Sequence, residues 1–86
     1  MEQNKFRLSS FIYINELGDS FALFNEKYSD TFVIENAFRW IIDTLKTEQL
    51  SSLELFALQQ TKSLNYEEII SVVEQFVASK ILVKVS

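Results

Sequence analysis

Carboxylates and hydroxyls are the side chains of this sequence that could perform chemistry. They form four pairs along the chain: Glu67 with Glu68, Asp30 with Glu35, Asp19 with Ser20, and Ser51 with Ser52. Neighbouring residues of a helix point about 100° apart, so Glu67 and Glu68 do not converge on one substrate atom. The chain contains no histidine, the usual base that activates a serine hydroxyl. We therefore expect a protein that has no catalytic residues and is not an enzyme.

The same composition removes most metal and cofactor chemistry. Cysteine is absent as well as histidine, which excludes disulfides, thiol nucleophiles and the commonest zinc ligands. We expect neither a metal site nor a cofactor. The formal net charge is −4 and the eight cations are scattered singly along the sequence. This pattern disfavours a nucleic-acid partner, because phosphate contacts need clustered Lys and Arg.

Length and hydropathy indicate one folded domain covering residues 1–86. Apolar residues make up 48% of the chain and include eight Phe, which is enough apolar surface for a small domain to build a core. The first residues contain no apolar segment typical of a signal peptide, and no apolar run approaches the ~18 residues of a membrane span. We expect a cytoplasmic protein without a membrane partner.

β-forming residues dominate the first part of the chain. Continuous or alternating apolar residues predict three strands, at residues 6–14, 21–24 and 31–34. Gly18, the only glycine, lies between the first two strands, where a hairpin turn needs a residue tolerant of positive φ. Six mostly polar residues, 25–30, separate the second strand from the third. The pattern predicts a three-stranded meander.

From residue 35 onward the apolar spacing becomes helical. Three helices are predicted: residues 36–46, a second from a cap at Ser51 or Ser52 to near Thr61, and a third from a capping box at Asn65 and Glu68 through Ser79. Residues 81–85 alternate and are typical of a strand, but the sequence leaves open whether this strand covers an edge of the sheet. The order predicts an α+β, winged-helix-like domain, with an N-terminal three-stranded antiparallel sheet followed by three helices.

The third helix has the position of a recognition helix, but its charged residues do not suit phosphate. Before Lys80 these are Glu67, Glu68 and Glu74, which would repel nucleic acid. Four of its apolar residues fall within about 60° of one direction, and two more lie on opposite shoulders; they are Tyr66, Ile69, Val73 and Phe76, then Ile70 and Val72. Such a wide arc indicates either a second contact surface or a deeply buried helix.

The third strand, residues 31–34, is short and leads directly into a helix. In a meander such a strand lies at the edge of the sheet, with unpaired backbone N–H and C=O groups. No proline or lysine protects it, so it could accept a further strand, as in peptide recognition by β-augmentation. The alternative is that its shortness and the flanking Asp30 and Glu35 are sufficient protection.

In this order of elements the chain resembles the PqqD-like family, the small recognition elements of ribosomally synthesised and post-translationally modified peptide (RiPP) pathways. Four stretches carry the resemblance, across nearly the whole chain: residues 21–24, 31–34, 40–45 and 66–82. It implies a winged-helix-like peptide chaperone for a precursor peptide. The precursor's leader peptide would add as a strand to the third strand and lie beside the third helix.

Carried over by position, the resemblance assigns peptide binding to eight residues: Thr31, Phe32, Val33, Ile34, Ile69, Val72, Val73 and Phe76. It implies that a separate modifying enzyme acts on the bound precursor, such as a radical SAM enzyme, a cyclase or a leader protease. The alternative is an acidic winged-helix module that binds protein partners in transcription or complex assembly. An open strand edge is equally compatible with a monomer and with a dimer paired through that edge.

Overall fold

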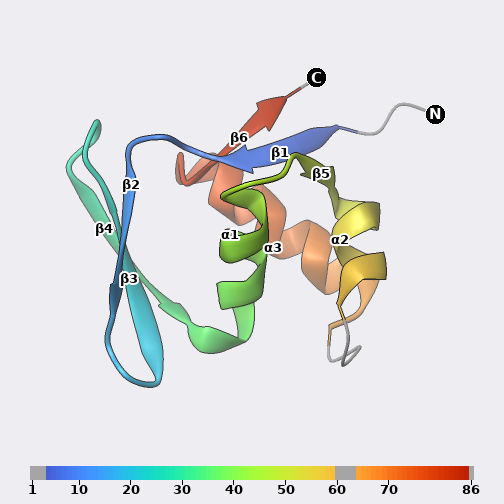
Figure 1. The fold of residues 1–86 in the computed structure, drawn as a ribbon, viewed down its shortest axis with the longest axis horizontal. Coiled ribbons are helices and arrows are strands. Elements are labelled where there is room, and N and C mark those ends of the chain that lie inside the picture. The colour runs from blue at the N-terminus through green and yellow to red at the C-terminus, as the bar shows by residue number, and fades with distance from the viewer. Residues whose placement is uncertain (1–3, 60–63, 86) are drawn as a thin grey trace.

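The computed structural model describes residues 4–59 and 64–85 and has an α+β fold (Figure 1). Within these residues it contains two three-stranded antiparallel sheets and three α-helices. The elements in chain order are β1 (Lys5–Leu8), β2 (Ile12–Glu16), β3 (Ser20–Asn25), β4 (Asp30–Glu35), the 3₁₀ helix η1 (Asn36–Phe38), α1 (Arg39–Leu45), β5 (Leu50–Ser51), α2 (Ser52–Leu58), α3 (Tyr66–Ala78) and β6 (Leu82–Val85).

The prediction of a single first strand over residues 6–14 is wrong. A turn at residues 9–11 divides it into β1 and β2, which belong to different sheets. The Ser9 hydroxyl accepts a hydrogen bond from the Phe11 N–H (3.4 Å), and its carbonyl accepts one from the Ile12 N–H (3.4 Å). No glycine or proline marks this turn, so a serine side chain satisfies its backbone instead.

The predicted meander is present as β2, β3 and β4, with β3 in the middle. Ile14 and Ile34 lie opposite Leu23 and Phe21 of the central strand. Gly18 has a φ of +91° in the first turn, where a side chain would be strained. The second turn also contains a residue with positive φ, Ser29, at +55°.

The predicted cap of the second helix and the predicted capping box of the third are both confirmed, and the cap of the second is Ser51. The Ser51 hydroxyl accepts from the Glu54 N–H at the start of α2, and the Asn65 side chain accepts from the Glu68 N–H at the start of α3. The first helix begins with the 3₁₀ turn η1 at Asn36 and ends at Leu45. The second ends at Leu58, before an extended Gln59; its predicted end near Thr61 lies outside the described residues.

The C-terminal strand β6 is also confirmed, and it pairs with β1 rather than with β4. The third helix ends in a Schellman motif just before it: the N–H of Ile81 donates to Phe76 (2.9 Å) and that of Lys80 to Val77 (3.0 Å). The first sheet therefore has the order β5-β1-β6. The two-residue strand β5 lies between the first and second predicted helices, where the sequence predicts no strand.

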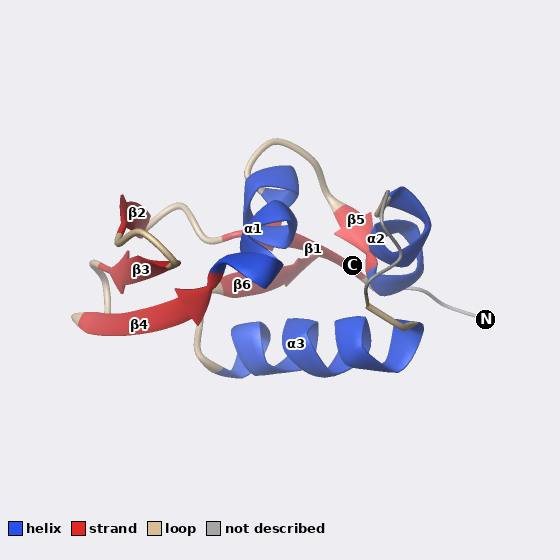
Figure 2. Cartoon of the chain, turned by 90° about the horizontal axis from the view of Figure 1, so that it is seen from below, coloured by secondary structure: helices blue, strands red, loops and turns tan. Residues whose placement is uncertain are grey.

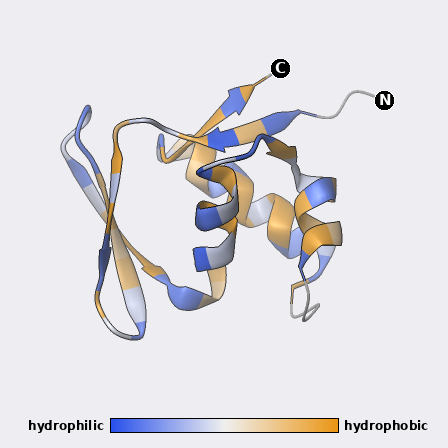
Figure 3. Ribbon diagram, viewed as in Figure 1, coloured by the Kyte–Doolittle hydropathy of each residue, from blue (hydrophilic) through white to orange (hydrophobic). Residues whose placement is uncertain are grey.

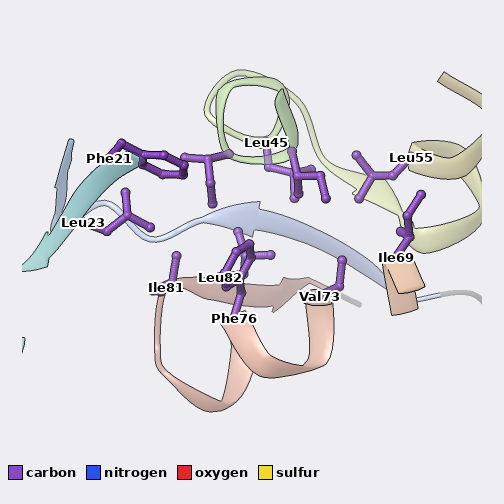
Figure 4. Close-up of a cluster of buried hydrophobic side chains, with 11 residues drawn as sticks. Phe21, Leu23, Leu45, Leu55, Ile69, Val73, Phe76, Ile81 and Leu82 are labelled. Atoms are coloured by element: carbon purple, nitrogen blue, oxygen red, sulfur yellow. The ribbon is translucent and has the colours of Figure 1, made fainter. Parts of the chain in front are cut away.

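The core lies between the two sheets and the helices. Figure 4 shows side chains from β3, α2, α3 and β6 meeting there, and Figure 3 shows α3 largely apolar along its length. The buried apolar side chains are Phe21, Leu23, Ile41, Ile42, Leu45, Leu55, Ile69, Val73, Phe76, Ile81 and Leu82. Trp40 packs against this cluster, half-buried. Among the described residues no helix has the length and apolar character needed to cross a bilayer.

Candidate functional site

β4 is an edge strand. It pairs with β3 on one side, and in the described part of the chain no strand lies on its other side. The C-terminal strand, the element of this chain that could have covered the edge, pairs with β1. Figure 2 shows β2, β3 and β4 stacked on the left, with β4 lowest and at the level of α3. The open edge and the third helix are therefore on the same side of the molecule.

The hydrogen-bond alternation of the sheet identifies the backbone groups on that edge. The Leu17 N–H donates to the Ser20 carbonyl and the Glu26 N–H to the Phe11 carbonyl. Since antiparallel pairs alternate between bonded and non-bonded, even-numbered residues of β3 bond to β2 and odd-numbered ones to β4. In the β3–β4 register the bonded residues of β4 are then Phe32 and Ile34. Thr31 and Val33 direct their N–H and C=O groups to the open edge.

The side chains of β4 alternate between the two faces of the sheet. Phe32 and Ile34 are half-buried and pack against the core, whereas Thr31 is exposed. Val33 is 65% exposed on the outer face, the largest exposure of any bulky apolar side chain among the described residues. A strand added to this edge would form hydrogen bonds with the backbone of Thr31 and Val33. Its inward-facing side chains would extend the surface formed by Phe32 and Ile34.

The residues of α3 that were nominated for peptide binding do not form one exposed surface. Ile69 and Val73 are fully buried and Phe76 is 5% exposed, so their side chains belong to the core. The wide apolar arc of this helix therefore reflects mostly burial. Val72 is the nominated residue of α3 that remains half-exposed.

Helix geometry places Val72 on one particular shoulder of α3. Tyr66 packs edge-to-face on Phe56 of α2, with ring centroids 5.8 Å apart, and Val77 lines a hollow beside β6. At 100° per residue, Val72 lies about 120° from Tyr66 and about 140° from Val77. Val72 therefore faces away from both α2 and β6, on the edge of the core cluster.

β2 is the other edge of the meander. The end of β2 is bound to α1: the Arg39 guanidinium contacts the Glu16 carboxylate (2.7 Å) and the Asp43 carboxylate (3.1 Å). Hydrogen bonds to these two carboxylates raise the pKa of the Arg39 guanidinium. The β4 edge has no corresponding ion pair among the described residues.

The described residues give no sign of a metal centre, since no group of three or more acidic side chains converges among them. Three hollows of about 310 to 420 Å³ are lined by described residues, and none of them includes a nominated residue. Comparisons with protein-family models, curated proteins and solved structures found no match for this chain.

Proposed function

We propose that this protein binds the leader peptide of a ribosomally made precursor by strand addition to β4 and delivers it to a separate modifying enzyme. The observation that supports this function best is the open edge of β4. There the backbone groups of Thr31 and Val33 are unpaired by any described strand, on the side of the molecule where α3 lies. An extended peptide is the ligand whose own backbone complements such an edge.

The energetics divide the binding between backbone and side chains. Four or five ladder hydrogen bonds at about 1 kcal/mol each supply about 5 kcal/mol, whereas micromolar affinity needs about 8 kcal/mol and the peptide must also be ordered. Burial of two or three apolar leader residues, at about 1.5 to 3 kcal/mol each, closes the difference. Phe32, Ile34 and Val72 are the nominated, half-buried apolar residues that could receive them.

The winged-helix-like, PqqD-like assignment is part of the same proposal. A meander followed by three helices is the order that the family resemblance requires, and the chain has it in β2 to β4 and α1 to α3. The chemistry would reside in the partner, such as a radical SAM enzyme, a cyclase or a leader protease. The absence of histidine and cysteine from the sequence supports this division of roles.

Amide hydrogen exchange, read residue by residue by NMR, tests the proposal. The probe is a synthetic leader segment from a short precursor gene neighbouring the gene for this chain. Binding should slow exchange at Thr31 and Val33 at least tenfold, while Phe32 and Ile34, already bonded to β3, should change little. Protection that appears only elsewhere, or equally at all four amides, would contradict strand addition at β4.

A second candidate function is an acidic module that binds protein partners through a folded surface. It is favoured by the outer face of the meander, where Tyr13, Phe24 and Val33 are all exposed. Tyr13 and Phe24 are directly opposite each other in the register, and together they form a small apolar surface. In this case a partner would perturb Tyr13 and Phe24 without protecting the Thr31 amide.

A further inference from the structure

A hollow of about 310 Å³ lies between β6 and the turn that joins β3 to β4, and half of the cations of the chain line it. They come from four separate segments: Arg7 from β1, Lys27 from the turn after β3, Lys80 from the turn after α3, and Lys84 from β6. The hollow has no carboxylate in its lining. In a chain of net charge −4 this is a marked separation of charge.

These four cations form no ion pair with a described residue. By contrast, Arg39 is paired with two carboxylates and Lys5 with Glu54 (3.7 Å). The Lys27 ammonium lies 5.6 Å from the ring centres of both Phe11 and Tyr28, which position it by cation–π attraction. The hydroxyls of Ser9 and Ser10 add neutral donors to the same lining.

The backbone at Lys80 adopts a conformation that is unfavourable for a lysine. Its φ is +66°, at the position of a Schellman motif where glycine is usual. A lysine there is less favourable than glycine, because its Cβ lies too close to the following carbonyl oxygen. The cation that this backbone carries lies at the hollow.

β6 gives the hollow a second recognition element, a free strand edge. It pairs with β1 on one side and ends the first sheet of the described chain on the other. The Ser9 N–H donates to the Ile81 carbonyl at 3.0 Å, in register with the β1–β6 ladder. By alternation the bonded residues of β6 are Val83 and Val85, so Leu82 and Lys84 direct their backbone groups away from β1. Leu82 is 2% exposed and Lys84 is exposed, so Lys84 is the residue whose outward groups a partner strand can reach.

We propose that this hollow and the β6 edge bind an acidic, extended segment of a partner protein. Carboxylates of the segment would contact the cations that line the hollow, and its backbone would pair with Lys84. The overall charge of −4 opposes a long polyphosphate more than a short peptide with few charges. The site is distinct from the β4 edge, so it does not depend on the proposed leader binding.

The test is fluorescence anisotropy with a labelled six-residue probe of alternating Glu and Val, and with the matched Gln and Val peptide. The acidic probe should bind at least tenfold more tightly than the neutral one in 50 mM salt. Its affinity should fall at 0.3 M salt. The double variant Arg7→Gln/Lys84→Gln should lose at least tenfold, with amide shifts in the wild type centred on residues 82–85 rather than on β4.

A matched control removes the same charge elsewhere. Lys5→Gln/Lys46→Gln lowers the net charge equally but touches no residue of this hollow, and it should change probe affinity less than twofold. Equal loss in both double variants, or equal binding of the neutral peptide, would overturn the proposal. An oligo-dT strand of equal charge that binds more tightly would point to nucleic acid instead. If the protein self-associates with increasing concentration and Arg7→Gln/Lys84→Gln abolishes this, the hollow binds a second copy of the chain instead.

Discussion

The side chain of Asn25 donates a hydrogen bond from Nδ2 to the carbonyl oxygen of Lys80 over 3.0 Å, joining two turns that are 55 residues apart. Asn25 is 1% exposed, and its Oδ1 also accepts from the Tyr28 N–H at 3.2 Å. One buried amide therefore ties the β3–β4 turn to the turn that leads from α3 into β6. It fixes the meander with its open edge relative to α3 and to the first sheet.

Asn25→Asp should lower the free energy of unfolding by about 1 to 3 kcal/mol. The change keeps an acceptor for Tyr28 but removes the donor, and it places a carboxylate against the Lys80 carbonyl in a buried position. Urea denaturation at pH 7 measures the loss. Asn15→Asp, at an exposed site of β2, is the control and should cost under about 0.5 kcal/mol. Equal effects of the two variants would contradict the role given to Asn25.

Val33→Pro should weaken leader binding at least tenfold and leave the fold intact. Proline removes an N–H that points away from β3, and edge strands tolerate proline at such positions. Calorimetric titration with the leader segment measures the loss, and circular dichroism checks the fold.

The matched variant is Phe32→Pro, which removes an N–H that bonds to Leu23 of β3 in the inferred ladder. It should destabilise the sheet itself, by about 3 kcal/mol. If Val33→Pro binds the leader as tightly as the wild type, the peptide does not pair with this edge.

Phe76→Ala and Val72→Ala should separate folding from binding on α3. Phe76 lies in the core, so its truncation should cost about 3 to 5 kcal/mol of stability. Val72 is half-buried, and its truncation should cost about 1 kcal/mol of stability and weaken leader binding about fivefold. Urea denaturation and titration calorimetry measure the two quantities. Unchanged affinity in Val72→Ala would remove this shoulder of α3 from the site.

Lys80→Gly should stabilise the protein by about 1 kcal/mol, because glycine adopts positive φ without the clash that a side chain brings. The same change should weaken binding of the acidic probe to the hollow beside β6. A higher melting temperature together with a lower probe affinity would mean that Lys80 contributes to binding although its backbone is strained. Ser29→Gly, also at positive φ, controls for the backbone and should stabilise without affecting the probe.

The free energy of unfolding should depend on pH below about 4.5, the ordinary pKa of Glu54. The Ser51 N–H donates to its carboxylate at 2.9 Å, which lowers the pKa of Glu54 in the folded state. Its stabilising effect is therefore complete above pH 4.5 and is lost as the pH falls through the lowered value. Glu54→Gln should be less stable than the wild type at pH 7, and the difference should shrink as the pH falls through the lowered pKa of Glu54. Urea midpoints across this range measure the difference, and a constant gap would contradict the assignment.

The predictability of this fold followed the strength of its local signals. Asn65 and Glu68 revealed the start of α3 because a capping box is a purely local hydrogen-bond pattern. The turn at Ser9 escaped notice because apolar residues continue on both sides and a hydroxyl replaces the expected glycine. Burial of Phe76 rather than exposure depends on tertiary packing, which periodicity alone does not define.

The candidate site was predictable to a similar degree. The exposed edge of β4 follows from a short strand that runs directly into a helix. The cationic hollow did not, since its cations come from three distant parts of the sequence. The pairing of β1 with β6 brings Arg7 beside Lys84, and the hydrogen bond from Asn25 to Lys80 brings the turn that carries Lys27 to the same place.

The pairing of Lys5 with Val85 leaves the beginning and the end of the described chain side by side, at the opposite end of the molecule from β4 (Figure 1). A tether to a larger protein at either terminus would thus emerge well clear of the β4 edge. The domain could be carried at the front or at the back of a fused polypeptide with the β4 edge facing outward in both arrangements.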